Sequence, residues 1–189
     1  MSRTTVFVLV ALGAAIAGFA FSSNARRGDG DGAATTTSVA AGEQTASLGW
    51  RETTGEPGER LVFSVETFRV LRNGWRVELS LENHTSAALR VMSTQQQPFG
   101  LMVLSTGDYG EFEQLARDDA LPTVRPAVRY EPRPPALLEP GDSWRGVISA
   151  PGALVAGSWV RVVFGGLVSV VRPQESLAWI TDHTYRVLP

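Results

Sequence analysis

Histidine and cysteine, which most often carry nucleophilic or metal chemistry, are scarce in this sequence. It has no cysteine and two histidines, His84 and His183. The missing thiols exclude disulfides, thiolate metal sites and cysteine nucleophiles within these residues. His84 follows Asn83 in a turn, His183 precedes the last predicted strand, and no His-x-x-x-His motif accompanies them. We therefore predict that both histidines lie in surface turns, with no metal and no cofactor.

A group of carboxylates could supply the acid and the base of a glycosidase. Five of them lie close together in the sequence: Asp108, Glu111, Glu113, Asp118 and Asp119. Glycoside hydrolysis needs two carboxylates that face each other across a cleft, whereas a solvated acidic loop needs no such geometry. No Gly-x-Ser-x-Gly nucleophile motif is present. The sequence therefore favours a protein that is not an enzyme, with a hydrolase using this acidic loop as the weaker alternative.

The residues best suited to recognising another protein lie in and near a proline-rich segment, residues 125–135. Arginine and tyrosine on an extended, proline-stiffened chain give a large contact area and lose little entropy on binding. The alternative is a loop that lies on the domain with its arginines neutralised by nearby carboxylates. The predicted partner-binding residues are Arg117, Arg125, Arg129, Tyr130 and Arg133.

Three tryptophans, Trp144, Trp159 and Trp179, leave a second class of binding function open. A carbohydrate or cell-wall binding module stacks sugar rings on exposed, coplanar tryptophans, whereas a hydrophobic core buries them. The positions of these side chains in the fold decide between the two interpretations.

The overall charge argues against nucleic acid as a partner. The 189 residues carry a formal charge of −2, whereas a nucleic-acid binder needs a clustered positive surface. All 17 basic residues are arginine, which, together with abundant alanine, glycine and valine, is typical of a GC-rich bacterial genome.

The first part of the chain predicts a membrane segment followed by a tether. Residues 4–23 are uncharged, and a helix of this length spans a hydrocarbon layer of roughly 30 Å. We predict that residues 1–25 form a signal peptide or a transmembrane anchor, with the following domain outside the cytoplasm, or secreted if the leader is cleaved. Residues 26–50 predict a flexible linker, because they carry too little apolar surface to fold.

Residues 51–189 predict a single all-β domain. Apolar residues alternate with polar ones from Leu61 onward, a change of parity near Thr67 indicates a bulge, and Asn73-Gly74 predicts a type I′ hairpin turn. About eight short apolar runs separated by turn residues are typical of a sandwich or barrel. Beyond the hairpin we expect strands at 89–93, 99–104, 143–149, 158–164, 167–171 and 184–188, and one helix at 111–119.

One strand motif resembles a known family. The run Trp75-x-Val-x-Leu-x-Leu-x-Asn83 resembles the strand ending in Asn of small immunoglobulin-like domains tethered outside bacterial cells, the telokin-like group. The later segments Leu138-Glu-Pro-Gly-Asp-Ser and Trp159-Val-Arg-Val-Val-Phe are similar to that group's second half. The resemblance covers most of residues 60–188 and implies an immunoglobulin-like two-sheet sandwich that serves binding or assembly. We therefore expect a membrane-tethered, non-catalytic module that binds another envelope protein.

Overall fold

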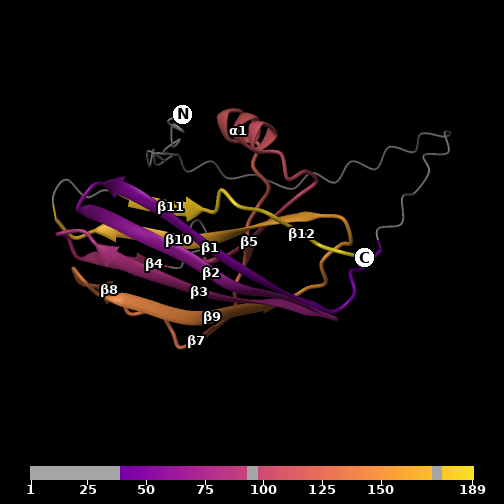
Figure 1. Cartoon of the computed structure of the whole chain (residues 1–189), viewed down its shortest axis with the longest axis horizontal. Helices are drawn as coiled ribbons and strands as arrows, with labels where there is room; N and C mark the ends of the chain where they lie inside the picture. The colour runs from indigo at the N-terminus through magenta and orange to yellow at the C-terminus, as the bar shows by residue number, and fades with distance from the viewer. Residues whose placement is uncertain (1–38, 93–97, 172–175) are drawn as a thin grey trace, which may run out of the picture.

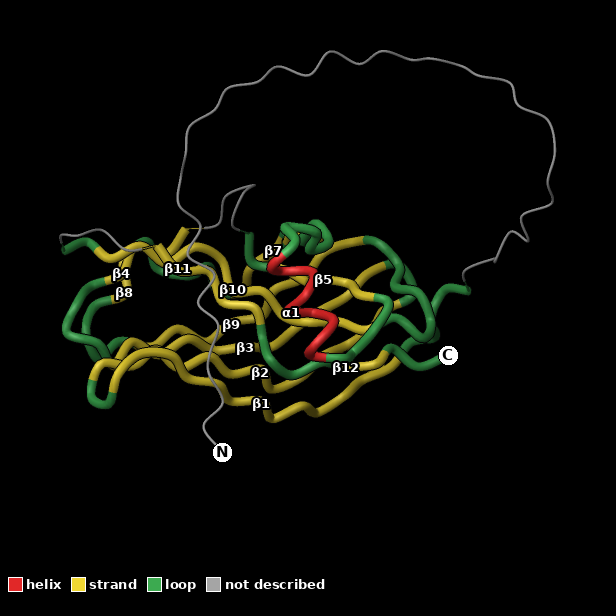
Figure 2. Tube along the Cα trace, turned by 90° about the horizontal axis from the view of Figure 1, so that it is seen from above, coloured by secondary structure: helices red, strands yellow, loops and turns green. Residues whose placement is uncertain are grey.

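Two antiparallel β-sheets packed face to face form the domain (Figure 1 and Figure 2). The computed structural model describes residues 39–92, 98–171 and 176–189, and for these residues the predicted all-β, two-sheet architecture is confirmed. The five-stranded sheet has the order β1 (Gln44–Glu56), β2 (Glu59–Leu71), β3 (Gly74–His84), β9 (Ser143–Pro151) and β7 (Arg129–Glu131). The seven-stranded sheet consists of β6 (Arg125–Pro126), β5 (Gly100–Leu104), β10 (Trp159–Ser169), β4 (Leu89–Met92), β8 (Leu137–Leu138), β11 (Ser176–Ile180) and β12 (Tyr185–Arg186).

The core lies between the sheets and is built by alternation along the strands. In β3, every second residue from Trp75 to Leu81 is fully buried, while the residues between them are exposed or half-buried. The two sheets meet through aromatic rings, with the Phe63 centroid 5.0 Å from that of Phe164 and 5.1 Å from that of Trp179. Each such side chain stabilises the fold by about 1.5–3 kcal/mol through removal of its apolar surface from water.

The hairpin between β2 and β3 forms where the sequence predicts it, but its turn differs. Leu71 pairs with Gly74, so that Arg72 and Asn73 form the turn. A type I′ turn needs a positive φ at both central residues, and neither Asn73 nor Gly74 has one. The predicted type I′ turn is therefore wrong, although the hairpin itself is confirmed.

Gly74 is required instead by the close approach of β9. A Cβ atom at this position would lie 2.6 Å from the carbonyl oxygen of Ala150. We expect Gly74→Ala to lower the free energy of unfolding by about 1–3 kcal/mol, because the backbones of β3 and β9 must move apart. Chemical denaturation followed by tryptophan fluorescence measures the change. Gly42→Ala is the matched control, since a Cβ there makes only ordinary contacts, and equal effects of the two substitutions would contradict this account.

Strand β1 corrects the predicted domain boundary. The predicted end of the linker at residue 50 and the predicted start of the domain at residue 51 are wrong, because β1 already begins at Gln44. A shift in pairing with β2 occurs at Gly49, whose φ is 58°. The inward-facing positions of β1 still alternate through this bulge, from Ala46, Leu48 and Trp50 to Glu52 and Thr54. Because the last two are polar, the alternation of apolar and polar residues in the sequence is short.

The start of β1 and the last residues of the chain lie side by side, close to the C-terminal label in Figure 1. Gln44 Nε2 donates to the carbonyl oxygen of Leu188 at 3.1 Å. Gln44 Oε1 accepts from the Leu188 amide at 3.0 Å and from the Tyr185 hydroxyl at 2.8 Å. One side chain therefore ties the entry of the domain to its end.

Most of the remaining strand predictions are confirmed. A shift in register between Val65 and Thr67 confirms the predicted bulge. The strands predicted at 158–164 and 167–171 are a single strand, β10, with an irregularity in its pairing with β11 beyond Phe164. Strands β4, β5, β9 and β12 lie where the sequence predicts them, whereas β11 was not predicted.

The predicted leader, residues 1–25, and the membrane segment within it, residues 4–23, lie outside the described residues. The same holds for the predicted linker up to residue 38. In the part of the chain that the structure describes, no helix is long and apolar enough to cross a membrane.

Helix α1 (Tyr109–Arg117) covers part of the outer face of the seven-stranded sheet (Figure 1). It starts before the predicted range, 111–119, because Asp108 caps it: the Asp108 side chain accepts a hydrogen bond from the Glu111 amide at 2.8 Å. Phe112 packs on a second apolar cluster, formed by outward-facing residues of β5 and β10.

Candidate functional site

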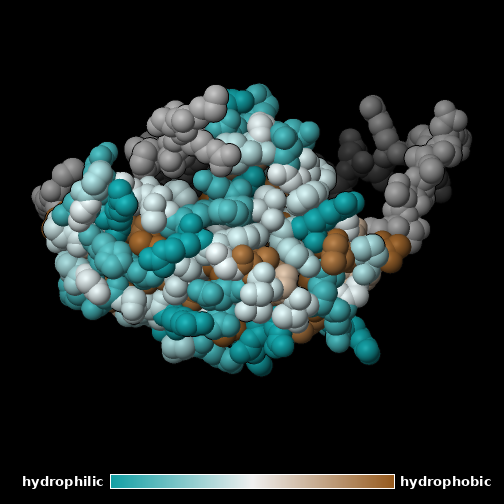
Figure 3. All heavy atoms as spheres, viewed as in Figure 1, coloured by the Kyte–Doolittle hydropathy of each residue, from teal (hydrophilic) through white to brown (hydrophobic). Residues whose placement is uncertain are grey.

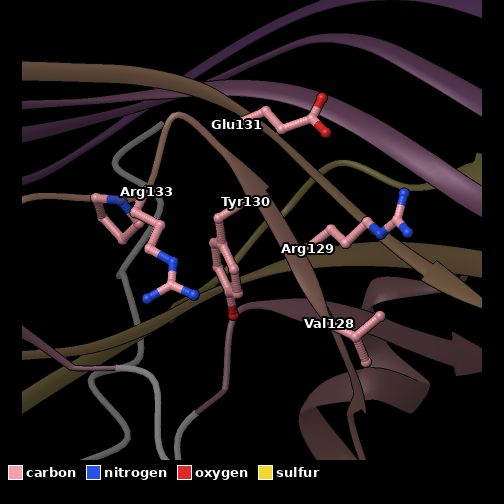
Figure 4. Close-up of a pocket in the computed structure, with 6 residues that line it drawn as sticks. Val128, Arg129, Tyr130, Glu131 and Arg133 are labelled. Atoms are coloured by element: carbon pink, nitrogen blue, oxygen red, sulfur yellow. The ribbon is translucent and has the colours of Figure 1, made fainter.

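The proline-rich crossing forms an open pocket beside β7, the last strand of the five-stranded sheet. The crossing passes from one sheet to the other, since β6 pairs with β5 and β7 pairs with β9. The pocket has a volume of about 420 Å³ (Figure 4). Its described lining residues are Val128, Arg129, Tyr130, Glu131, Arg133 and Pro134.

Tyr130 forms a fixed wall of this pocket. Its half-buried ring meets the buried ring of Phe99 edge-on, with 6.1 Å between the centroids. The chain before β7 is anchored as well, because the Ala127 amide donates to Phe99 O at 2.8 Å and the Val128 amide donates to Ser149 O at 2.9 Å. A ligand that binds here meets a preformed surface and loses little entropy in ordering it.

Two arginines give the pocket its positive charge. Arg129 and Arg133 are exposed, and no ion pair is recorded between either of them and a described residue. Glu131, which also lines the pocket, has its carboxylate Oε2 3.6 Å from Arg76 Nη2 on the neighbouring surface. Among the described residues, therefore, no carboxylate neutralises Arg129 or Arg133.

The structure brings together three of the five predicted partner-binding residues and separates the other two. Arg117 ends α1, on the opposite side of the domain from β7 (Figure 1), and its Nη1 lies 3.9 Å from Glu113 Oε2. Arg125 is exposed in β6, where its Nη1 donates to the carbonyl oxygen of Ala153 at 3.1 Å. Of the predicted group, the pocket therefore contains Arg129, Tyr130 and Arg133.

Glu52 is a buried carboxylate that the sequence does not single out. It points inward from β1, and its side chain is 6% exposed. Trp179 Nε1 donates to it at 2.8 Å, the amides of Asp182 and His183 each donate at 3.0 Å, and His183 Nδ1 lies 2.7 Å away. Because Trp179 belongs to the other sheet, Glu52 joins the two sheets at the edge formed by β1.

The two histidines differ in their surroundings. His183 has a side chain that is 54% exposed, and its ring stacks on that of Trp50 at 5.5 Å in addition to its contact with Glu52. His84 is exposed, and its Nε2 lies 2.9 Å from Glu82 Oε2. Within the described residues, no group of three or more histidine or carboxylate side chains could hold a metal ion.

Glu82 lies in a second, smaller pocket of about 320 Å³ over β3 and β9. Arg51 Nη1 lies 2.9 Å from Glu82 Oε1. Hydrogen bonds from Arg51 and then from His84 hold the pKa of the Glu82 carboxyl below its usual value. Glu82 is therefore an ionised surface carboxylate, and the guanidinium group of Arg51 already neutralises it.

Arg161 is a buried cation beneath α1. It is fully buried in β10, and its Nη1 donates to the carbonyl oxygens of Thr181 and Asp182 at 2.6 and 2.7 Å. Its Cζ lies 4.0 Å from the centroid of the Phe112 ring, a cation–π geometry. Burial lowers the pKa of the guanidinium, but arginine stays charged in proteins. Arg161 thus fixes the turn that supplies two of the donors to Glu52.

Three of the acidic residues in and around α1 stabilise the helix. Asp108 caps its start, Glu113 pairs with Arg117, and Asp118 Oδ2 accepts from Gln114 Nε2 at 2.8 Å. No residue of α1 is buried. These carboxylates therefore lack the enclosed setting that a general acid uses.

The tryptophans do not form a flat surface for sugar rings. All five lie in the part of the chain that the structure describes, and Trp75, Trp144 and Trp179 are buried. The other two are half-buried and lie on different sheets, Trp50 on β1 and Trp159 on β10. Sugar stacking needs exposed aromatic faces, which this arrangement does not offer as a pair.

Comparison with known proteins adds no family to this geometry. No protein-family model, no curated protein and no solved structure matches the chain. The resemblance to the telokin-like domains therefore depends on the sequence motifs alone.

Proposed function

We propose that this protein is a non-catalytic interaction module of the cell envelope, held at the membrane by residues 4–23. Its binding surface is the pocket beside β7. The observation that carries the proposal is a preformed pocket with two exposed arginines, Arg129 and Arg133, that have no ion pair with a described residue. Arginine next to a fixed aromatic ring is enriched in protein interfaces. An immunoglobulin-like sandwich, which the resemblance implies, suits this role.

The length of the tether supports a partner in the envelope. Between the proposed membrane segment and the first described residue, Val39, lie residues 24–38. If these form the predicted flexible linker, their average end-to-end distance is about 21 Å. The domain therefore stays close to the membrane surface, where its pocket meets other envelope proteins.

Site-specific photo-crosslinking in cells that express the full chain tests the proposal. A photoreactive residue replaces Val128, which is 61% exposed at the pocket. A matched probe replaces Leu71, which is 42% exposed at the end of β2. We expect the probe at position 128 to give one discrete crosslinked protein and the probe at position 71 to give none. Absence of a crosslink at position 128, or the same crosslink from both positions, contradicts the proposal.

A further inference from the structure

Two arginines of the five-stranded sheet are paired on its outer face, unlike Arg129 and Arg133 at the β7 pocket. On β9, Arg145 Nη2 lies 2.7 Å from Glu78 Oε1, and on β1, Arg51 pairs with Glu82. The face seen in Figure 3 is mainly hydrophilic, with its hydrophobic residues in small, separate patches. This face therefore offers no large apolar surface for recognition, which leaves charged and polar contacts.

The ligand chemistry follows from the two arginines. A guanidinium group binds a planar carboxylate with two parallel hydrogen bonds. Figure 4 shows Arg133 beside Tyr130, whereas Arg129 points away from both. A ligand that contacts both guanidinium groups must therefore extend along the strand, which a single small anion cannot do.

We propose that the ligand of this pocket is an extended, acidic segment of the partner protein, whose carboxylates bind Arg129 and Arg133. This inference rests on the proposed function and specifies its partner. Val128, which is exposed at the same edge, offers an apolar contact next to Arg129. Tyr130 supplies the rigid wall against which the segment lies.

An anionic lipid surface is the weaker candidate ligand. Attraction to such a surface grows with the number of adjacent basic residues, at about 1 kcal/mol for each, and only two line the described part of the pocket.

The test is a titration of the full chain in nanodiscs of neutral phosphatidylcholine. The probe is a blocked hexaglutamate peptide, its control is hexaglutamine, and the readout is the NMR chemical shift of the backbone amides of residues 128–131 and 133. We expect hexaglutamate alone to shift these amides, and the effect to weaken with added salt. The double variant R129Q/R133Q should bind about tenfold more weakly. Arg60→Gln, which removes an exposed arginine outside the pocket, should leave the affinity unchanged.

Three results overturn the inference. In the first, hexaglutamate does not shift these amides. In the second, Arg60→Gln and the double variant lose equal affinity for hexaglutamate. In the third, the amides shift only with phosphatidylglycerol nanodiscs or with inorganic phosphate. The crosslink at position 128 separates this failure from that of the proposed function. A crosslink that persists in R129Q/R133Q supports the proposed interaction module and contradicts the proposal that its ligand is acidic. Hexaglutamate binding without any crosslink supports the ligand chemistry and contradicts the proposed function.

Discussion

Replacing Glu52 with alanine will lower the free energy of unfolding by about 3–5 kcal/mol. The substitution removes the acceptor for Trp179 Nε1, for the amides of Asp182 and His183 and for the His183 ring. Buried donors without an acceptor keep the full cost of their lost hydration. Chemical denaturation of the full chain in detergent, followed by tryptophan fluorescence, measures the loss.

Two further variants make the Glu52 prediction specific. Glu56→Ala changes an exposed carboxylate of the same strand, and its effect should stay within about 0.5 kcal/mol. Glu52→Gln keeps one acceptor oxygen but turns an amide group toward the donors, so we expect a smaller loss than in Glu52→Ala. A loss of less than about 1 kcal/mol in Glu52→Ala would show that the carboxylate does not hold the two sheets together.

Replacing Asn83 with alanine should lower the free energy of unfolding by about 2–4 kcal/mol. The Asn83 side chain is fully buried, and its Nδ2 donates to the carbonyl oxygens of Ala87, Leu138 and Glu139 at 2.9, 3.0 and 3.2 Å. Its Oδ1 accepts from the Thr85 amide at 3.0 Å and from the Thr85 hydroxyl at 2.7 Å. Alanine leaves all of these groups without their partner.

Asn83→Asp tests the account of Asn83 most directly, because it keeps the shape of the side chain. A carboxylate oxygen would then face carbonyl oxygens in place of the amide donor, so the loss should equal or exceed that of Asn83→Ala. His84→Ala, which changes the exposed next residue, serves as the control and should stay within about 0.5 kcal/mol. If Asn83→Asp is more stable than Asn83→Ala, the hydrogen bonds do not explain the role of this residue. The equilibrium denaturation midpoints of the three variants give the comparison.

The parts of the fold that follow local alternation could be predicted from the sequence. Strand β3 has an apolar residue at every second position from Trp75 to Leu81, and the hairpin before it has strong turn residues. Strand β1 could not be found in this way, because its inward-facing positions change from apolar to polar at Glu52, so that only Ala46, Leu48 and Trp50 show the alternation. A polar residue that points inward is recognisable only when its partners, far away in the sequence, are known.

The residue types of the candidate site could be predicted from the sequence, but which of these residues lie together in the fold could not. The segment that holds Arg129, Tyr130 and Arg133 was recognisable by its prolines and its residue types. Which of the arginines lie together depends on the sheet that each short strand joins, and two- or three-residue strands such as β6 and β7 carry no periodicity that would show this. The burial of Arg161 depends in the same way on α1, which packs on it from another part of the chain.

The side-chain link between Gln44 and Leu188 has a mechanical consequence. Strands β1 and β7 form opposite edges of the five-stranded sheet, so the proposed membrane tether at β1 and the proposed partner at β7 would pull on the domain from opposite edges. The load would then cross every strand of that sheet, and Gln44 would pass part of it to the end of the chain. Rupture under tension would require the separation of paired strands, so in the proposed arrangement the domain would bear force between the membrane and its partner.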